Sequence, residues 1–162
     1  MGTIITRRFD ATVLVAALMI IAAAIANAGE RTLYAVDSNH IAIKGYDPVA
    51  YFTDRKAVKG ETRFAYVYDD AKWQFANAAH REMFVADPDH YMPQYGGFCA
   101  FGTAQGYKVD GDPNIWKIVD NKLYLNLAKK VGARWREDIP GNIKIADEKW
   151  QVLKDKAPGD LQ

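Results

Sequence analysis

The side chains of this sequence that could bind a metal ion gather mainly between residues 80 and 99. Outside the apolar N-terminal segment, the soft and borderline donors are His40, His80, Met83, His90, Met92 and Cys99. Thiolate, thioether and imidazole groups together suit Cu(I). We therefore predict a metal site, with copper as the favoured ion, in which Cys99 is the principal donor and His80 or His90 assists. The sequence has no Cys-x-x-Cys pair and no His-x-x-x-His pair, so the spacing typical of zinc sites is absent.

Cys99 is the only cysteine, so it cannot form a disulfide within the chain. It is therefore a small buried apolar residue, a partner in an intermolecular disulfide, or a group used in chemistry. A thiol activated by a histidine, with Asp47 or Asp87 orienting the imidazole, would make the protein a thiol redox enzyme. We nevertheless expect no enzyme activity. The sequence contains no haem-attachment, dinucleotide-binding, phosphate-binding-loop or hydrolase motif.

The loop from Gly96 to Gly102, which contains this cysteine, is rich in glycine and aromatic residues. Paired glycines let a backbone turn tightly and bring amide groups close to a ligand or to a neighbouring strand. Tyrosines commonly line small-molecule pockets, and they equally fill small cores. We predict a site for a small ligand near this loop, as an alternative to the metal site. Its expected residues are Tyr46, Asp47, Tyr95, Gly96, Gly97 and Phe98.

The hydrophobic pattern predicts an α+β fold, in which a small antiparallel sheet is flanked by helices in a single domain. The residue pattern over 36–52 predicts either two short strands, at 41–43 and 49–52, or a strand and a turn. Alternation of apolar and polar residues predicts a strand at 62–68, and a hairpin is expected with arms at 115–119 and 122–127. Segments with helical spacing predict helices at 71–86, 129–137 and 146–155.

The helix expected over 71–86 would carry His80 on its apolar face. Asp69 and Asp70 precede it and are typical N-cap residues. Asp87 and Pro88 should end it, because the residue before a proline avoids the α conformation. A histidine on an apolar helix face is either a core residue or a ligand, so this position leaves both roles open.

The first 28 residues have the three parts of a secretory signal peptide. Arg7 and Arg8 precede an uncharged apolar stretch over 11–26, and Ala26-Asn27-Ala28 is a small-x-small cleavage site. The alternatives are an uncleaved anchor and, because of the paired arginines, a twin-arginine export signal. Cleavage near Ala28 would release a periplasmic domain, residues 29–162, with no stable membrane insertion.

The charge balance gives no electrostatic argument for a nucleic acid or a membrane surface as the partner. The 162 residues carry a formal net charge of +1, and the 134 residues left after cleavage would carry 19 basic and 19 acidic side chains. A nucleic-acid-binding protein usually shows a basic excess on one face. We therefore expect no nucleic-acid partner. The expected partner is a metal ion or a small ligand, with a protein partner as the alternative.

A set of spaced aromatic, proline and glycine residues resembles the exported bacterial branch of the YHS domain family. The matching segments are Lys44-Gly45-Tyr46-Asp47-Pro48-Val49-Ala50-Tyr51-Phe52, Trp73-x-Phe75, Phe84-x-x-Asp87-Pro88, Tyr91-x-Pro93-Gln94-Tyr95-Gly96-Gly97-Phe98-Cys99-Ala100, Lys122-Leu123-Tyr124-Leu125-Asn126, Trp135 and Ala146-Asp147-x-x-Trp150. The resemblance covers nearly all of residues 29–162. It implies a metal site built from cysteines, and those positions fall on Ala50, Ala76 and His80, so only His80 retains a side chain that could bind.

The sequence therefore favours a periplasmic, non-catalytic binding module for a metal ion, copper above others, or for a small ligand near the Gly96–Gly102 loop. The first alternative is a protein-interaction or accessory module without a metal. In that case the glycine and aromatic loop would meet a partner chain. The second alternative is a thiol redox enzyme that acts through Cys99.

Overall fold

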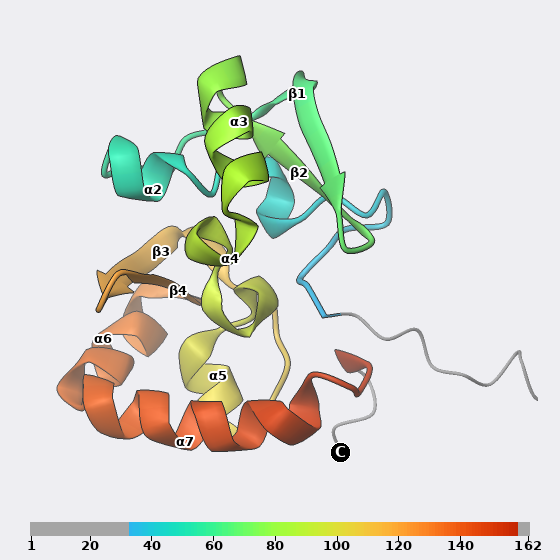
Figure 1. Cartoon of the computed structure of the whole chain (residues 1–162). Coiled ribbons are helices and arrows are strands. Elements are labelled where there is room, and N and C mark those ends of the chain that lie inside the picture. Colours follow the sequence, from blue (N-terminus) through green and yellow to red (C-terminus); the bar gives the residue numbers. More distant parts are fainter. Residues whose placement is uncertain (1–32, 159–162) are drawn as a thin grey trace, which may run out of the picture. The chain divides into compact units, whose positions relative to one another are not determined.

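The computed structural model describes residues 33–158, so the predicted signal peptide, residues 1–28, lies outside the described residues. The described residues belong to one compact unit. They form six α-helices and two antiparallel sheets of two strands each, which confirms the α+β fold (Figure 1). None of the helices in this part of the chain combines the length and the apolar character needed to cross a membrane.

The first sheet is a hairpin of β1 (Glu61–Tyr68) and β2 (Ala71–Phe75). The strand predicted over 62–68 is confirmed. The predicted helix over 71–86 is wrong in its first part, because Asp69 and Asp70 have φ of 49° and 60° and form the hairpin turn instead of a helix cap. The register of the pair is irregular between Glu61 and Tyr66.

The helix that follows β2 is shorter than the sequence predicts. α3 (Ala78–Ala86) begins after Asn77, whose side chain accepts a hydrogen bond from the His80 amide. Asp87 ends α3 as expected and caps the short α4 (Pro88–Tyr91) by accepting a hydrogen bond from the His90 amide. His80 is buried on α3, as the helical spacing predicts.

For residues 36–52 the sequence leaves open two short strands or a strand and a turn, and neither strand, at 41–43 or at 49–52, is formed. The chain forms a 3₁₀ turn, η1 (Ile43–Gly45), and a short helix, α2 (Ala50–Thr53). An alternation of residue types over only three or four positions cannot distinguish a helical turn from a strand. The helical turn is fixed by the Asp47 carboxylate, which accepts hydrogen bonds from the backbone amides at its start.

The second half of the unit follows the sequence more closely. It contains η2 (Gln94–Gly97), α5 (Ala100–Gln105), β3 (Asp112–Val119), β4 (Lys122–Asn126), α6 (Lys129–Glu137) and α7 (Ile139–Leu153). The predicted hairpin and the helix over 129–137 are confirmed. The helix predicted at 146–155 is the second half of α7, which starts earlier because Asp138 caps it.

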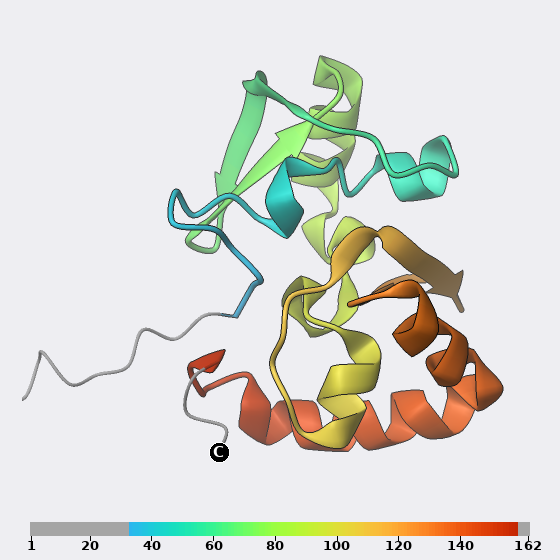
Figure 2. The ribbon, with the colours of Figure 1, turned by 180° about the vertical axis from the view of Figure 1, so that it is seen from behind.

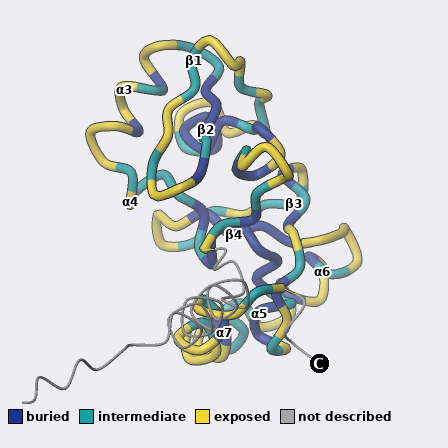
Figure 3. Tube along the Cα trace, turned by 90° about the vertical axis from the view of Figure 1, so that its right-hand side faces the viewer, coloured by how far each residue is buried: buried dark blue, intermediate teal, exposed yellow. Residues whose placement is uncertain are grey.

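Two apolar clusters form the core, and β4 contributes to both. Leu123 and Leu125 pack into the cluster that contains Trp73, while Tyr124 packs into the cluster that contains Trp135. Successive side chains of a strand point to opposite faces, which explains this division. Figure 3 shows β4 as a largely buried strand. In Figure 2, which shows the molecule from behind, α5 lies next to α7.

Lys108 is a buried cation that anchors the end of α7. Only 3% of the residue is exposed. Its Nζ donates to the Lys156 carbonyl at 2.7 Å and lies over the rings of Phe98 and Trp150, at 4.8 and 5.5 Å from their centroids. Burial lowers the pKa of this ammonium from 10.5 to about 8, and the Asp155 charge opposes the shift.

The depressed pKa of Lys108 makes stability depend on pH in a defined direction. Between about pH 8 and 10.5 the unfolded chain retains the proton that the folded chain has lost, so the free energy of unfolding rises with pH. We expect it to rise by up to about 3 kcal/mol relative to Lys108→Met, measured by urea denaturation at each pH. The difference between wild type and the exposed-site control Lys149→Met should not change with pH in this way, and a pH-independent difference between wild type and Lys108→Met would contradict the prediction.

Candidate functional site

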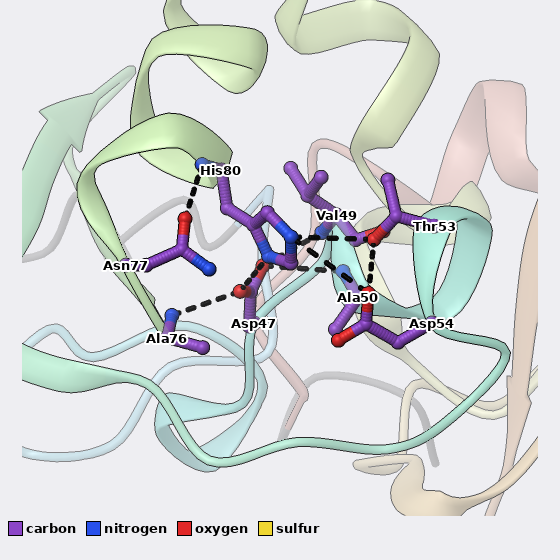
Figure 4. Close-up of polar contacts among 8 residues, drawn as sticks. All are labelled: Asp47, Val49, Ala50, Thr53, Asp54, Ala76, Asn77 and His80. Carbon is purple, nitrogen blue, oxygen red and sulfur yellow. Dashed lines mark hydrogen bonds and ion pairs between the residues drawn. The ribbon is translucent and has the colours of Figure 1, made fainter.

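A fully buried carboxylate, Asp47, lies at the centre of the most densely bonded polar group of the described residues (Figure 4). Its Oδ1 accepts hydrogen bonds from the Val49 and Ala50 amides at 2.8 and 3.3 Å. Its Oδ2 accepts one from the Ala76 amide at 2.8 Å and lies 2.6 Å from His80 Nδ1. A buried charge is stable only when it is paired and hydrogen-bonded in this way.

His80 connects this carboxylate to the end of α2. The Asp47 carboxylate already accepts three backbone N–H groups, so Nδ1 of the ring donates to it, which fixes the orientation of the imidazole. The other nitrogen, Nε2, lies 3.3 Å from Thr53 Oγ1 and 3.8 Å from Asp54 Oδ1. The side chain of His80 is only 10% exposed.

The order carboxylate, imidazole and hydroxyl is the order found in catalytic triads. Here, however, the Thr53 hydroxyl lies within hydrogen-bonding distance of Asp54 Oδ1, at 2.8 Å, and of the Val49 carbonyl, at 3.2 Å. The single hydroxyl proton of Thr53 therefore has three possible acceptors, namely these two oxygens and His80 Nε2. The contact between Thr53 and His80 joins α2 to α3.

Cys99 lies at the start of α5 and caps this helix. It is 0% exposed, and its Sγ accepts hydrogen bonds from the amides of Gly102 and Leu127, each at 3.3 Å. The same sulfur lies 3.6 Å from Asn126 Oδ1. The thiol thus joins the first turn of α5 to the end of β4, and it is enclosed by these groups.

The three predicted metal ligands each have a different set of partners. His80 contacts Asp47, while His90 contacts the rings of Phe52 and Tyr91, at centroid distances of 5.0 and 4.5 Å. Within residues 33–158, no group of three or more His, Cys, Asp or Glu side chains could hold a metal ion. The structure therefore does not bring Cys99, His80 and His90 together as one metal site.

Burial of Cys99 predicts slow alkylation of the native protein. Because the thiol is enclosed, iodoacetamide can reach it only when the structure opens. For an ordinary domain stability we expect native labelling to be at least about 1000-fold slower than labelling in urea, measured by mass spectrometry. Cys99→Ser with Gln151→Cys supplies an exposed thiol as the control. Native labelling of wild type at the rate of this control would contradict the burial.

Two of the six predicted ligand residues line a cleft next to the Gly96 turn. Tyr95 and Gly96 contribute to a cleft of about 250 Å³, together with Tyr34, Asp89, Gln94 and Trp150 among others. None of these four residues is predicted as a ligand residue from the sequence. Gln94 and Trp150 belong to segments that carry the resemblance and Asp89 lies between two such segments, but nothing in the sequence indicates that Tyr34 and Trp150 meet Asp89 and Gln94.

The other four predicted ligand residues lie outside this cleft. Asp47 belongs to the buried group described above, and Gly97 and Phe98 are buried in the fold. The Tyr46 ring lies under the Lys59 ammonium, 4.6 Å from its centroid. The predicted set therefore combines residues from separate parts of the molecule.

Aromatic side chains with hydrogen-bonded hydroxyls contribute to the wall of the cleft. Tyr34 donates to Asp69 Oδ2 and Tyr95 donates to Asp147 Oδ1, both at 2.9 Å. Burial is the main reason that the pKa values of both tyrosines are raised, and the hydrogen-bonded carboxylates add to it. The Trp150 ring meets Tyr95 edge to face at 5.8 Å.

Comparisons with known proteins gave no match to this chain. No family model matches it. No curated protein and no solved structure matches it either. Its function is therefore inferred from its own residues and their geometry.

Proposed function

We propose that this protein is a periplasmic, non-catalytic binding module, similar to YHS domains, that holds a small organic ligand in the cleft beside Tyr95 and Gly96. The observation that carries the proposal is the composition of that cleft. It combines aromatic walls with two polar side chains, Asp89 and Gln94, that make no side-chain hydrogen bond within residues 33–158. The exposed lining of the cleft is about as polar as it is apolar, and polar groups that are free to bond fix the orientation of a small ligand.

The residues of this chain do not fit a copper centre of the cysteine type. The resemblance places metal-binding cysteines at Ala50, Ala76 and His80, and these three positions do converge here. The amides of Ala50 and Ala76 and the imidazole of His80 all bond to the Asp47 carboxylate. This convergence supports the resemblance, but two methyl groups and one bonded imidazole cannot replace a set of thiolates.

The alternatives that involve the Gly96–Gly102 loop receive less support. A partner chain docking on this loop would need exposed side chains, whereas residues 95–100 are buried. A thiol redox enzyme would need an accessible Cys99, whereas its sulfur is enclosed and bonded by two amides. Both observations favour a ligand in the neighbouring cleft.

The proposal can be tested by screening uncharged, cationic and anionic fragments against ¹⁵N-labelled protein. A ligand in the cleft should shift the amide signals of Tyr34, Gln94 and Gly96 and the Trp150 indole signal together, in a saturable way. Gln94→Trp, which fills the cleft, should abolish these shifts, while Gln151→Trp on the exposed face of α7 should retain them. Signals that never move, or that move equally in both variants, would contradict the proposal.

A separate measurement addresses copper directly. We expect elemental analysis after copper loading and desalting to find no stoichiometric copper in wild type, and the same result for Cys99→Ser. The reason is that Cys99, His80 and His90 do not share a site. Retention of one copper per chain in wild type and its loss in Cys99→Ser would replace the small-ligand proposal by the metal hypothesis.

A further inference from the structure

We infer that the cleft beside Tyr95 and Gly96 selects a small organic cation, such as an alkylammonium compound. The inference rests on the proposed function, because it names the chemical class of the ligand for that site. It is supported by the charge of the cleft, by its aromatic walls and by its amide side chain.

The charge of the cleft is negative. Among the described residues that line it, Asp89 is the only ionisable side chain apart from the two tyrosines, and none is a lysine or an arginine. The Asp89 charge is near enough to Tyr34 to contribute to the raised pKa of that hydroxyl. Asp69 and Asp147 add negative charge close to the cleft, because their carboxylates accept hydrogen bonds from the hydroxyls of Tyr34 and Tyr95. An anionic ligand would be repelled by all three carboxylates.

The walls of the cleft suit a cation of low hydration. Tyr34, Tyr95 and Trp150 supply aromatic rings, whose faces attract ammonium groups and most strongly so in tryptophan. Quaternary and alkylated ammonium groups are recognised by such sites because they lose little hydration on binding.

The volume of the cleft and its Gln94 side chain restrict the ligand further. A volume of about 250 Å³ lies below the usual range for drug-sized ligands, so a compact molecule fits best. The Gln94 side chain offers both a donor and an acceptor and makes no hydrogen bond of its own within the described chain. A molecule with an ammonium group at one end and a hydroxyl or carbonyl group at the other satisfies both Asp89 and Gln94.

Choline and its uncharged isostere 3,3-dimethylbutan-1-ol are matched probes of this inference. Titration of ¹⁵N-labelled protein with each compound should shift the Trp150 indole signal, identified by its absence in Trp150→Phe. We expect choline to bind at least about five-fold more tightly than the isostere. Asp89→Asn should weaken choline about three- to five-fold without changing the isostere, whereas Glu82→Gln, which removes an exposed charge on α3, should change neither.

The outcomes separate the ligand class from the proposed function. Equal binding of choline and the isostere, or an Asp89→Asn variant with unchanged choline affinity, overturns the cation inference while the cleft remains a binding site. Shifts at the cleft with other fragments of the screen but with neither probe lead to the same conclusion. If no compound of any charge shifts the cleft signals, both the inference and the proposed function fail.

Discussion

Replacing Asp47 by alanine is expected to lower the free energy of unfolding by about 3–5 kcal/mol. The substitution leaves the buried amides of Val49 and Ala76 and the Nδ1–H of His80 without an acceptor. It also removes the link between α2 and α3, since His80 loses the group that orients it. Urea denaturation followed by circular dichroism measures the effect.

Two further variants show whether the loss comes from the buried network. Asp37 also accepts two backbone amides with its Oδ1, from Asn39 and Ile41, but in an exposed loop, so Asp37→Ala should cost only about 1 kcal/mol. Asp47→Asn keeps one acceptor oxygen, so its loss of unfolding free energy should lie between the losses of the two alanine variants. A cost for Asp47→Ala no larger than that for Asp37→Ala would show that the buried carboxylate contributes little.

Gly96→Ala is expected to destabilise the protein by about 3 kcal/mol or more and to deform the ligand cleft. Gly96 has φ of +62°, and a Cβ atom built on it would lie 1.8 Å from the Leu33 carbonyl oxygen. The chain at Leu33 would have to move away, which breaks the hydrogen bond from the Ala35 amide to the Gly96 carbonyl.

Gly106→Ala is the matched control for this substitution. Gly106 also has a positive φ, of +94°, but the nearest atom to an added Cβ is Lys149 Nζ at 3.7 Å. Gly106→Ala should therefore lower the free energy of unfolding only by the cost of placing an alanine at a positive φ, about 1 kcal/mol. Thermal unfolding of both variants, combined with the fragment titration, separates the two effects, and equal losses of stability would contradict the close approach at Gly96.

The parts of the fold that the sequence predicts correctly have local determinants. Asp120 and Asn121 adopt the positive φ values of a tight hairpin turn, so the arms on either side could be recognised. The helix predicted over 71–86 is wrong in its first part because Phe75 and Phe84 also fit a helical period, and because Asp69 and Asp70 are residue types that often cap a helix. The hairpin turn at these aspartates depends on pairing between β1 and β2, which is a contact between segments.

The candidate site was less predictable, because its partners are far apart in the sequence. The residue types of Cys99 and His80 suggested chemistry, but their bonding to Leu127 and to Asp47 spans about 30 residues in each case. The cleft combines residues from Leu33 to Trp150, and only Tyr95 and Gly96 among them are predicted from the sequence as ligand residues. Spacing along the chain carries little information about contacts of this range.

The irregular register of the first hairpin has a consequence for self-association in solution. Within the described residues β1 pairs with β2 alone, so its outer edge offers backbone groups to another chain. A long, flat and apolar edge of this kind would promote aggregation. The shift between Glu61 and Tyr66 interrupts the regular edge, and the ion pair between Arg63 and Glu61 places charges along it. β1 is therefore a poor template for strand addition, and this protects the protein at high concentration.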